Sequence, residues 1–243
     1  MAKKKTKQPA KLQEALVLFK YILNLFGCKD LAALSGDLKD PALEGVDDEG
    51  CSRMFHSLKR HLYTDVGISE QELREYDRHI VKYTKEINER RTEKITWKYY
   101  QYLALLFTEI YLDRYFTDKM RLLDDINCFL VDEFNFRPET WHEMPQFTDD
   151  DLNKLAFWCA TGSGKTLMLH VNIKQYLYYA EKYHAKKLNR ILILTPNEGL
   201  SNQHIQELKA SGFYAELFNK QGQGGLFGGK QTVEVIDINK LAD

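Results

Sequence analysis

The chain has 243 residues, of which 44% are hydrophobic, 12% aromatic and 28% charged. This composition provides enough apolar material for one large domain or two smaller ones, and it excludes wholesale disorder. The formal net charge of −1 excludes recognition of nucleic acid by overall charge, so any contact with DNA or RNA has to be local.

The N-terminal segment 1–11 carries five lysines and no apolar stretch. It predicts a basic, solvated tail and lacks the hydrophobic region of a secretory signal. The cysteines stand singly at Cys28, Cys51, Cys128 and Cys159, without a CxxC pair. We therefore expect reduced thiols in a cytoplasmic protein, with neither a disulfide scaffold nor a zinc ribbon.

Residues 12–150 have the pattern of a helical region. Apolar residues recur at three- and four-residue steps over 12–26, where Gly27 follows as a stop, and Ser69-Glu70-Gln71-Glu72 has the form of a capping box for a further helix. Residues 97–116 are apolar around most of a helix, which predicts a buried one. Charged side chains scattered through it argue against a membrane span, so we expect no membrane contact.

The chain changes character after a polar, proline-containing connection at 137–151, which is the expected domain boundary. Two short apolar runs, 155–159 and 191–194, enclose a helical stretch that begins at Lys165. A strand, helix, strand succession with unalternating strands is typical of a parallel sheet that is covered on both faces. We thus predict an α/β domain over 151–243.

Further elements follow the second run. They are a helix at 200–210, strands at 213–218 and 232–238, and a glycine-rich mobile loop at 219–231.

Between the first expected strand and its helix lies the segment Ala160-Thr161-Gly162-Ser163-Gly164-Lys165-Thr166. Its glycines let successive main-chain N–H groups face a phosphate chain, and the following helix adds its positive end. Lys165 is expected to bring a charge to the β- and γ-phosphates, and the Thr166 hydroxyl to hold Mg²⁺. The segment predicts a site for ATP and Mg²⁺ in which Lys165 and Thr166 are the catalytic residues.

One position departs from the usual pattern of such loops. The pattern begins with glycine five residues before the Gly-Lys pair, and Cys159 stands there. A small residue at this position leaves the anion site intact. A glycine turn followed by a chance Lys-Thr pair is the competing interpretation, and the flanking apolar run and helix argue against it.

The segments 159–166 and 194–204 together resemble superfamily 2 DEAD/DEAH-box helicases, most closely the R (Res) subunits of type I and type III restriction enzymes. The resemblance implies a RecA-like P-loop NTPase domain that is incomplete within 151–243. It also implies that polar side chains after the second strand contact the backbone of DNA, or alternatively RNA. These are Thr195, Asn197, Ser201 and Gln203. An ordinary strand-to-helix turn capped by Ser201 explains the same residues equally well.

The segment Lys98-Tyr99-Tyr100-Gln101 resembles the aromatic-glutamine element that reads adenine in this family. An amide suits that role because it pairs with the adenine edge in both directions. The distance in sequence to Lys165 is longer than usual. The competing interpretation is that Gln101 marks the surface of a buried helix.

Two functions remain open. The favoured one is the N-terminal part of an ATP-hydrolysing DNA helicase or translocase of a restriction or phage-defence system, acting with a defence-system protein partner. No acidic box follows Thr166, and Asp132-Glu133 precedes the loop as an expected surface pair, so the isolated 243-residue piece should be inactive. The alternative is a stand-alone ATP-binding interaction module without hydrolysis.

Overall fold

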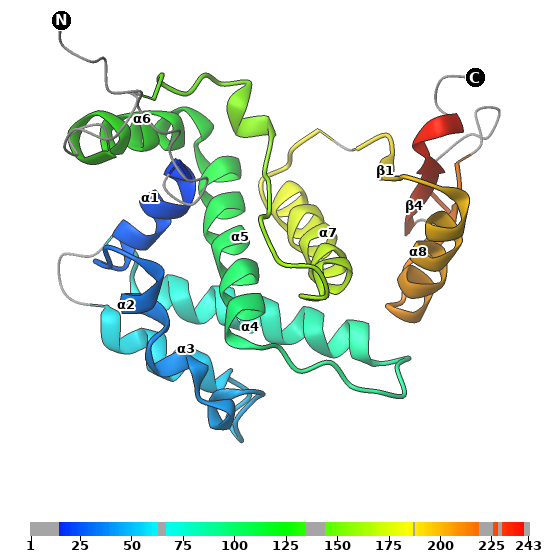
Figure 1. The fold of residues 1–243 in the computed structure, drawn as a ribbon, viewed down its shortest axis with the longest axis horizontal. Coiled ribbons are helices and arrows are strands. Elements are labelled where there is room, and N and C mark those ends of the chain that lie inside the picture. The colour runs from blue at the N-terminus through cyan, green and yellow to red at the C-terminus, as the bar shows by residue number, and fades with distance from the viewer. Residues whose placement is uncertain are drawn as a thin grey trace, which may run out of the picture. The chain divides into compact units, whose positions relative to one another are not determined.

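The computed structural model describes residues 15–62, 67–134, 144–186, 188–218, 226–227 and 230–240 (Figure 1). The helices are α1 (Val17–Leu25), α2 (Leu31–Ser35), α3 (Arg53–Leu58), α4 (Glu70–Asn88), α5 (Tyr99–Thr117), α6 (Lys119–Phe129), α7 (Lys165–Lys182) and α8 (Glu198–Ala210). The strands are β1 (Ile191–Thr195), β2 (Tyr214–Leu217), β3 (Leu226–Phe227) and β4 (Lys230–Asp237). The basic segment 1–11 lies outside the described residues.

The chain divides into two compact units. We call Met1–Asp77 with Leu106–Trp158 the helical unit, and Arg78–Leu105 with Cys159–Asp243 the sheet unit. The sheet unit thus combines the C-terminal part of the chain with the end of α4 and the start of α5. The expected boundary after residue 150 follows chain order and stays a prediction.

The helical unit contains the predicted N-terminal helix. Of the expected range 12–26, residues 17–25 form α1, residues 15 and 16 are not helical, and residues 12–14 lie outside the described part of the chain. The expected stop at Gly27 is confirmed, because this glycine has a left-handed φ of 66°. The following N–H, of Cys28, then reaches back to the carbonyl of Leu23 at 3.0 Å. Further along the chain, α6 packs on α1, with the rings of Tyr21 and Phe129 edge to face at 5.9 Å.

The predicted capping box starts α4. The N–H of Ser69 donates to Oε2 of Glu72 at 2.7 Å, and the N–H of Glu72 donates to Oγ of Ser69 at 3.2 Å. The next helix, α5, is buried on several sides, as expected, at Tyr102, Leu103, Leu105, Leu106, Ile110, Tyr111 and Leu112. Within the described ranges, no helix has the length and apolar character that a membrane crossing needs.

The acidic pair that precedes the loop lies in a π-helical turn, Leu130–Phe134, which continues α6. Asp132 is exposed there. The pair is therefore not at the end of a strand, where an acidic box would lie.

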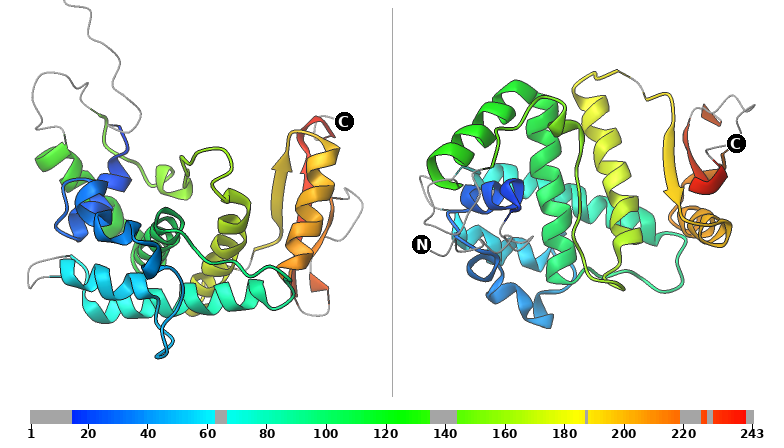
Figure 2. Two further views of the ribbon diagram at one scale, coloured as in Figure 1. Left: turned by 60° about the horizontal axis from the view of Figure 1, so that its bottom comes forward. Right: turned by 45° about the horizontal axis from the view of Figure 1, so that its top comes forward.

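The sheet unit holds a small parallel sheet with the order β1-β4-β2, and β3 pairs antiparallel with the start of β4. Figure 2 shows α8 lying along these strands. The core consists of Ile173, Ile193, Ile205, Leu208, Ala215, Val233 and Val235, which come from α7, α8 and the sheet. This arrangement fits a partial RecA-like α/β domain, as predicted.

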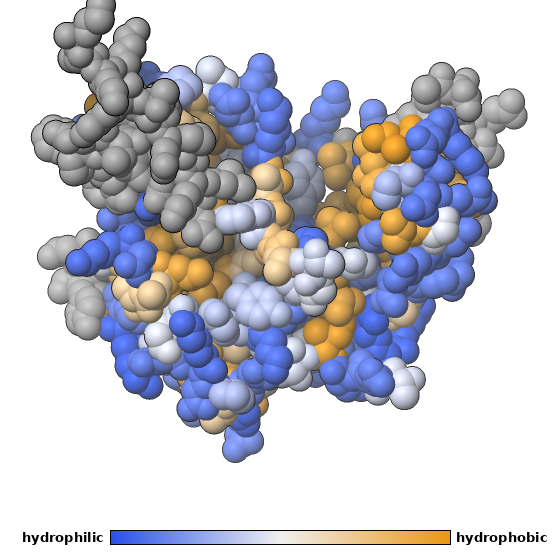
Figure 3. All heavy atoms as spheres, viewed as in Figure 1, coloured by the Kyte–Doolittle hydropathy of each residue, from blue (hydrophilic) through white to orange (hydrophobic). Residues whose placement is uncertain are grey.

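The prediction of a strand at 155–159 is wrong. No strand forms there, and Phe157 and Trp158 are 41% and 57% exposed. A strand needs a hydrogen-bonded neighbour, and this run has none among the described strands. Leu192 and Leu194 of β1 are exposed too. Figure 3 shows apolar surface at the place where Figure 1 labels β1. The expectation of a sheet covered on both faces is thus not met at β1.

Candidate functional site

The loop at residues 160–166 turns on two glycines with left-handed backbone, Gly162 at a φ of 75° and Gly164 at 81°. An L side chain is strained at such angles, which explains glycine at both positions. The N–H of Ser163 closes the turn by donating to the Ala160 carbonyl at 3.3 Å. Gly164 is then the N-cap of α7, so the loop leads directly to the positive end of an 18-residue helix.

The ammonium group of Lys165 folds back over this loop. Its Nζ donates to the carbonyl oxygen of Ala160 at 2.7 Å and to that of Cys159 at 3.2 Å. The side chain is exposed, so a phosphate can replace these carbonyls. Bonds between an ammonium and an anion are stronger than bonds to a neutral carbonyl, which favours the exchange.

Gln101, at the start of α5, lies against the loop although 62 residues separate it from Ser163. Its Nε2 donates to the Ser163 carbonyl at 2.9 Å, and its Oε1 accepts from the N–H of Lys98 at 2.9 Å. The long sequence gap therefore does not keep Gln101 from the loop. Its role in reading adenine stays a prediction.

Two hydroxyl groups of the loop are candidates for contact with a ligand. Ser163 is 8% exposed, and its buried Oγ has no partner among the described residues. A buried hydroxyl without a hydrogen bond costs about 1–3 kcal/mol, so a ligand that supplies one is favoured. Thr166 is the second residue of α7 and half-buried, and its hydroxyl is of the type that coordinates Mg²⁺ in such loops.

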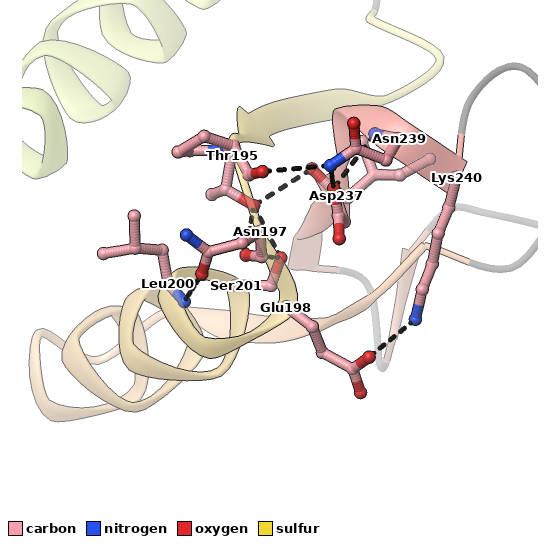
Figure 4. A network of polar contacts seen from close by, with 10 residues as sticks. Thr195, Asn197, Glu198, Leu200, Ser201, Asp237, Asn239 and Lys240 are labelled. Atoms are coloured by element: carbon pink, nitrogen blue, oxygen red, sulfur yellow. Dashed lines mark hydrogen bonds and ion pairs between the residues drawn. The ribbon is translucent and has the colours of Figure 1, made fainter.

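A second polar cluster lies where β1 ends and α8 begins (Figure 4). The hydroxyls of Thr195 and Ser201 meet at 2.6 Å, and both residues are buried. One hydroxyl donates to the other, and the accepting one is free to donate to a carbonyl: Oγ1 of Thr195 to Ile236 at 3.2 Å, or Oγ of Ser201 to Asn197 at 3.2 Å. These hydroxyls join β1, β4 and α8 inside the protein, and their assignment to nucleic acid stays a prediction.

Asn197 is the N-cap of α8, with Oδ1 accepting from the N–H of Leu200 at 2.9 Å. The expectation that Ser201 caps the helix is therefore wrong. A cap residue has extended backbone and precedes the first helical residue, whereas Ser201 already lies inside the first turn. Asn197 and Gln203 are both exposed, so their amide groups face solvent, where a phosphate backbone can reach them.

The sequence interpretation missed three residues of this cluster, which follow or end β4. The amide Nδ2 of Asn239 donates to the Pro196 carbonyl at 3.1 Å and to Asp237 at 2.9 Å. Lys240 pairs with Glu198 at 2.9 Å, both well exposed. The predicted parallel strand at 232–238 could have pointed to these residues. The carboxyl ends of parallel strands meet at one edge of a sheet, so residues at the end of β4 lie beside those at the end of β1.

The cluster also has no metal-binding character. Among the described residues, no group of three or more histidine, cysteine or acidic side chains is arranged to hold a metal ion.

The comparison with protein families gives one match. Residues 70–238, more than half of the chain, match the model described as type III restriction enzyme, res subunit. The chain belongs to the res subunit family of type III restriction enzymes. Comparisons with curated proteins and with solved structures gave no match.

The family is one of helicase-like, ATP-dependent restriction subunits, so the protein is of a helicase-like, ATPase-like enzyme kind. The matched segment begins with α4 and includes Gln101, the loop, the parallel sheet and α8. The resemblance drawn from residues 159–166 and 194–204 is thereby confirmed.

Proposed function

We propose that this res subunit binds Mg-ATP at the loop 160–166 and hydrolyses it to move on DNA in a cytoplasmic restriction or phage-defence system, together with a protein partner. The observation that carries the proposal is the joint placement of Gln101, the two left-handed glycines and Lys165 at the N-terminal end of α7.

The proposed binding of Mg-ATP is supported by groups that suit the phosphates, the base and the metal ion. The first-turn N–H groups of α7 and the Lys165 ammonium supply positive charge to the phosphates. Gln101 supplies an amide beside the loop for the base. Mg²⁺ would be held by the Thr166 hydroxyl and by the phosphates, where it neutralises negative charge.

The proposed contact with DNA is supported by the start of α8. Asn197 and Gln203 present exposed amides there, and the positive end of α8 favours phosphate oxygens. Such contacts carry no base information, which suits a protein that moves along a strand irrespective of its sequence. DNA rather than RNA is proposed because of the restriction-enzyme family.

The first experiment measures binding of a fluorescent ATP analogue with Mg²⁺ to the wild type and to Lys165→Ala. Loss of the ammonium should weaken binding at least tenfold, or about 1.4 kcal/mol, because a charge-assisted contact to phosphate is lost. The matched control is Lys186→Ala, an exposed lysine beyond the end of α7, which should bind like the wild type. Equal binding by Lys165→Ala and the wild type would refute the assignment.

A second experiment separates the motor from the stand-alone ATP-binding module. ATP hydrolysis by the full-length protein is measured with and without DNA duplex. Stimulation by DNA that disappears in Lys165→Ala supports the motor. Nucleotide binding without any DNA-dependent hydrolysis supports the module.

A further inference from the structure

In the sheet unit, the connection between α4 and α5 reaches α8 through Arg91. Its Nη2 donates to the Ser211 hydroxyl at 2.8 Å, to the Glu207 carboxylate at 2.9 Å and to the Glu207 carbonyl at 3.2 Å. The Arg91 side chain is only 14% exposed. The two N–H groups of this nitrogen are shared among three acceptors and are sheltered from water, so they hold the C-terminal end of α8.

The same turn of α8 is bonded to α7. Nδ1 of His170 lies 2.8 Å from the Ser211 hydroxyl, and both residues are buried. One turn further along α7, Lys174 pairs with Glu86 of α4 at 2.7 Å. Ser211 is thus shared between Arg91 and the helix that leaves the phosphate loop.

The other end of the connection is bonded to the loop itself. Asn88 braces the chain by donating to the Ile95 carbonyl at 2.9 Å and accepting from the Ile95 N–H at 2.8 Å. The N–H of Lys98 then bonds Gln101, whose amide bonds the Ser163 carbonyl. We call residues 88–101 the strap, because they are held to the loop at one end and to α8 near the other.

We propose that the strap couples nucleotide binding at the loop to DNA binding at α8, with Arg91 as its positioning residue on α8. The inference rests on the proposed function of both sites. A nucleotide that engages the loop and the Gln101 amide changes the bond between Gln101 and Ser163, and the braced strap carries that change to Arg91. Because α8 is one rigid helix, a shift of its last turn moves Asn197 and Gln203 at its start.

The test measures affinity for a labelled DNA duplex, with and without Mg²⁺ and a non-hydrolysable ATP analogue, on the full-length protein. The ratio of the two affinities is the coupling factor, which we expect to be about fivefold or more in the wild type. In Arg91→Met it should fall to about one, while DNA binding without analogue and analogue binding without DNA stay within about twofold of the wild type. Thermal unfolding checks that each variant is folded.

Two further variants distinguish transmission from a structural role. Gln101→Ala releases the strap at its other end and should also abolish the coupling factor, and the double variant should lose no more than either single one. The matched control is Arg60→Met, which removes an exposed arginine paired with Asp37 in the helical unit and should keep the wild-type ratio.

The outcomes separate the two proposals. An unchanged coupling factor in Arg91→Met, or a wild type that binds both ligands without coupling, overturns the inference and leaves the proposed function standing. A wild type that does not bind the analogue overturns both.

Discussion

The amide nitrogen of Gln101 lies 2.5 Å from the point that a Cβ atom on Gly164 would occupy. Glycine at position 164 is favoured by its left-handed φ of 81°. A Cβ atom there would in addition displace the Gln101 amide from its bond to the Ser163 carbonyl. The two effects can be separated, because Gly212 has a φ of 84° and open space around it.

Gly212→Ala should lower the free energy of unfolding by about 1 kcal/mol, through backbone strain alone. Gly164→Ala should cost about 1 kcal/mol more, because it also displaces Gln101 from its bond to Ser163. Adding Gln101→Ala removes the overlap, and the glycine substitution should then cost no more than at Gly212. Denaturant titration measures all of these. Equal costs at Gly164 and Gly212 would contradict the close approach.

His170 predicts a loss of stability in acid. Burial lowers the pKa of His170 from 6.5 to about 4, with a further contribution from the positive charges of Arg91, His204 and Lys174. The unfolded chain therefore binds the proton more readily than the folded one. The stabilisation is fully present above pH 6.5 and is lost as the pH falls toward 4.

Since each unit of pKa corresponds to about 1.4 kcal/mol, the fall from 6.5 to about 4 amounts to about 3.5 kcal/mol, of which about 2.5 kcal/mol develops between pH 7 and pH 4.5. Denaturant unfolding at pH 7 and pH 4.5 should show it as a difference between the wild type and His170→Asn, which has no titrating group there. Parallel pH dependence of the two proteins would count against a buried neutral His170.

Substitutions of Asn197 and Gln203 should differ in their effects on the free energy of unfolding. Asn197→Ala removes the N-cap of α8 and should cost about 1 kcal/mol of unfolding free energy. Gln203→Ala changes an exposed side chain and should leave stability within about 0.5 kcal/mol. If the two side chains contact phosphates, each substitution should weaken DNA binding by the same factor whatever the DNA sequence. Normal DNA binding by Gln203→Ala would remove it from the proposed interface.

Thr195→Val tests the internal role of the buried hydroxyl pair. The substitution keeps the shape of the side chain but removes the 2.6 Å bond to Ser201 and the bond to the Ile236 carbonyl. We expect a loss of about 1–3 kcal/mol in unfolding free energy. If Thr195 contacts DNA directly, binding should fall even under conditions where the variant is fully folded, which titration of labelled duplex at low temperature measures.

Helix ends could be predicted where a few adjacent residues specify them. The capping box at Ser69 and the stop at Gly27 depend on a few adjacent residues, and the structure shows both as predicted. The run 155–159 was misread because an apolar stretch becomes a strand only when another strand lies beside it. Nothing within the run specifies that partner.

The family could be predicted from short stretches of sequence, 159–166 and 194–204, and the family match bears this out. The same stretches predict phosphate binding at the loop, because glycines, a lysine and a helix start act through the adjacent main chain. Which distant groups lie beside the loop and within the polar cluster depends on the packing of the whole fold. This packing brought Gln101 to Ser163 and Arg91 to Ser211, and it turned Thr195 and Ser201 toward each other rather than outward. Such contacts depend on how helices and strands pack, and packing is a property of the whole fold that no single motif encodes.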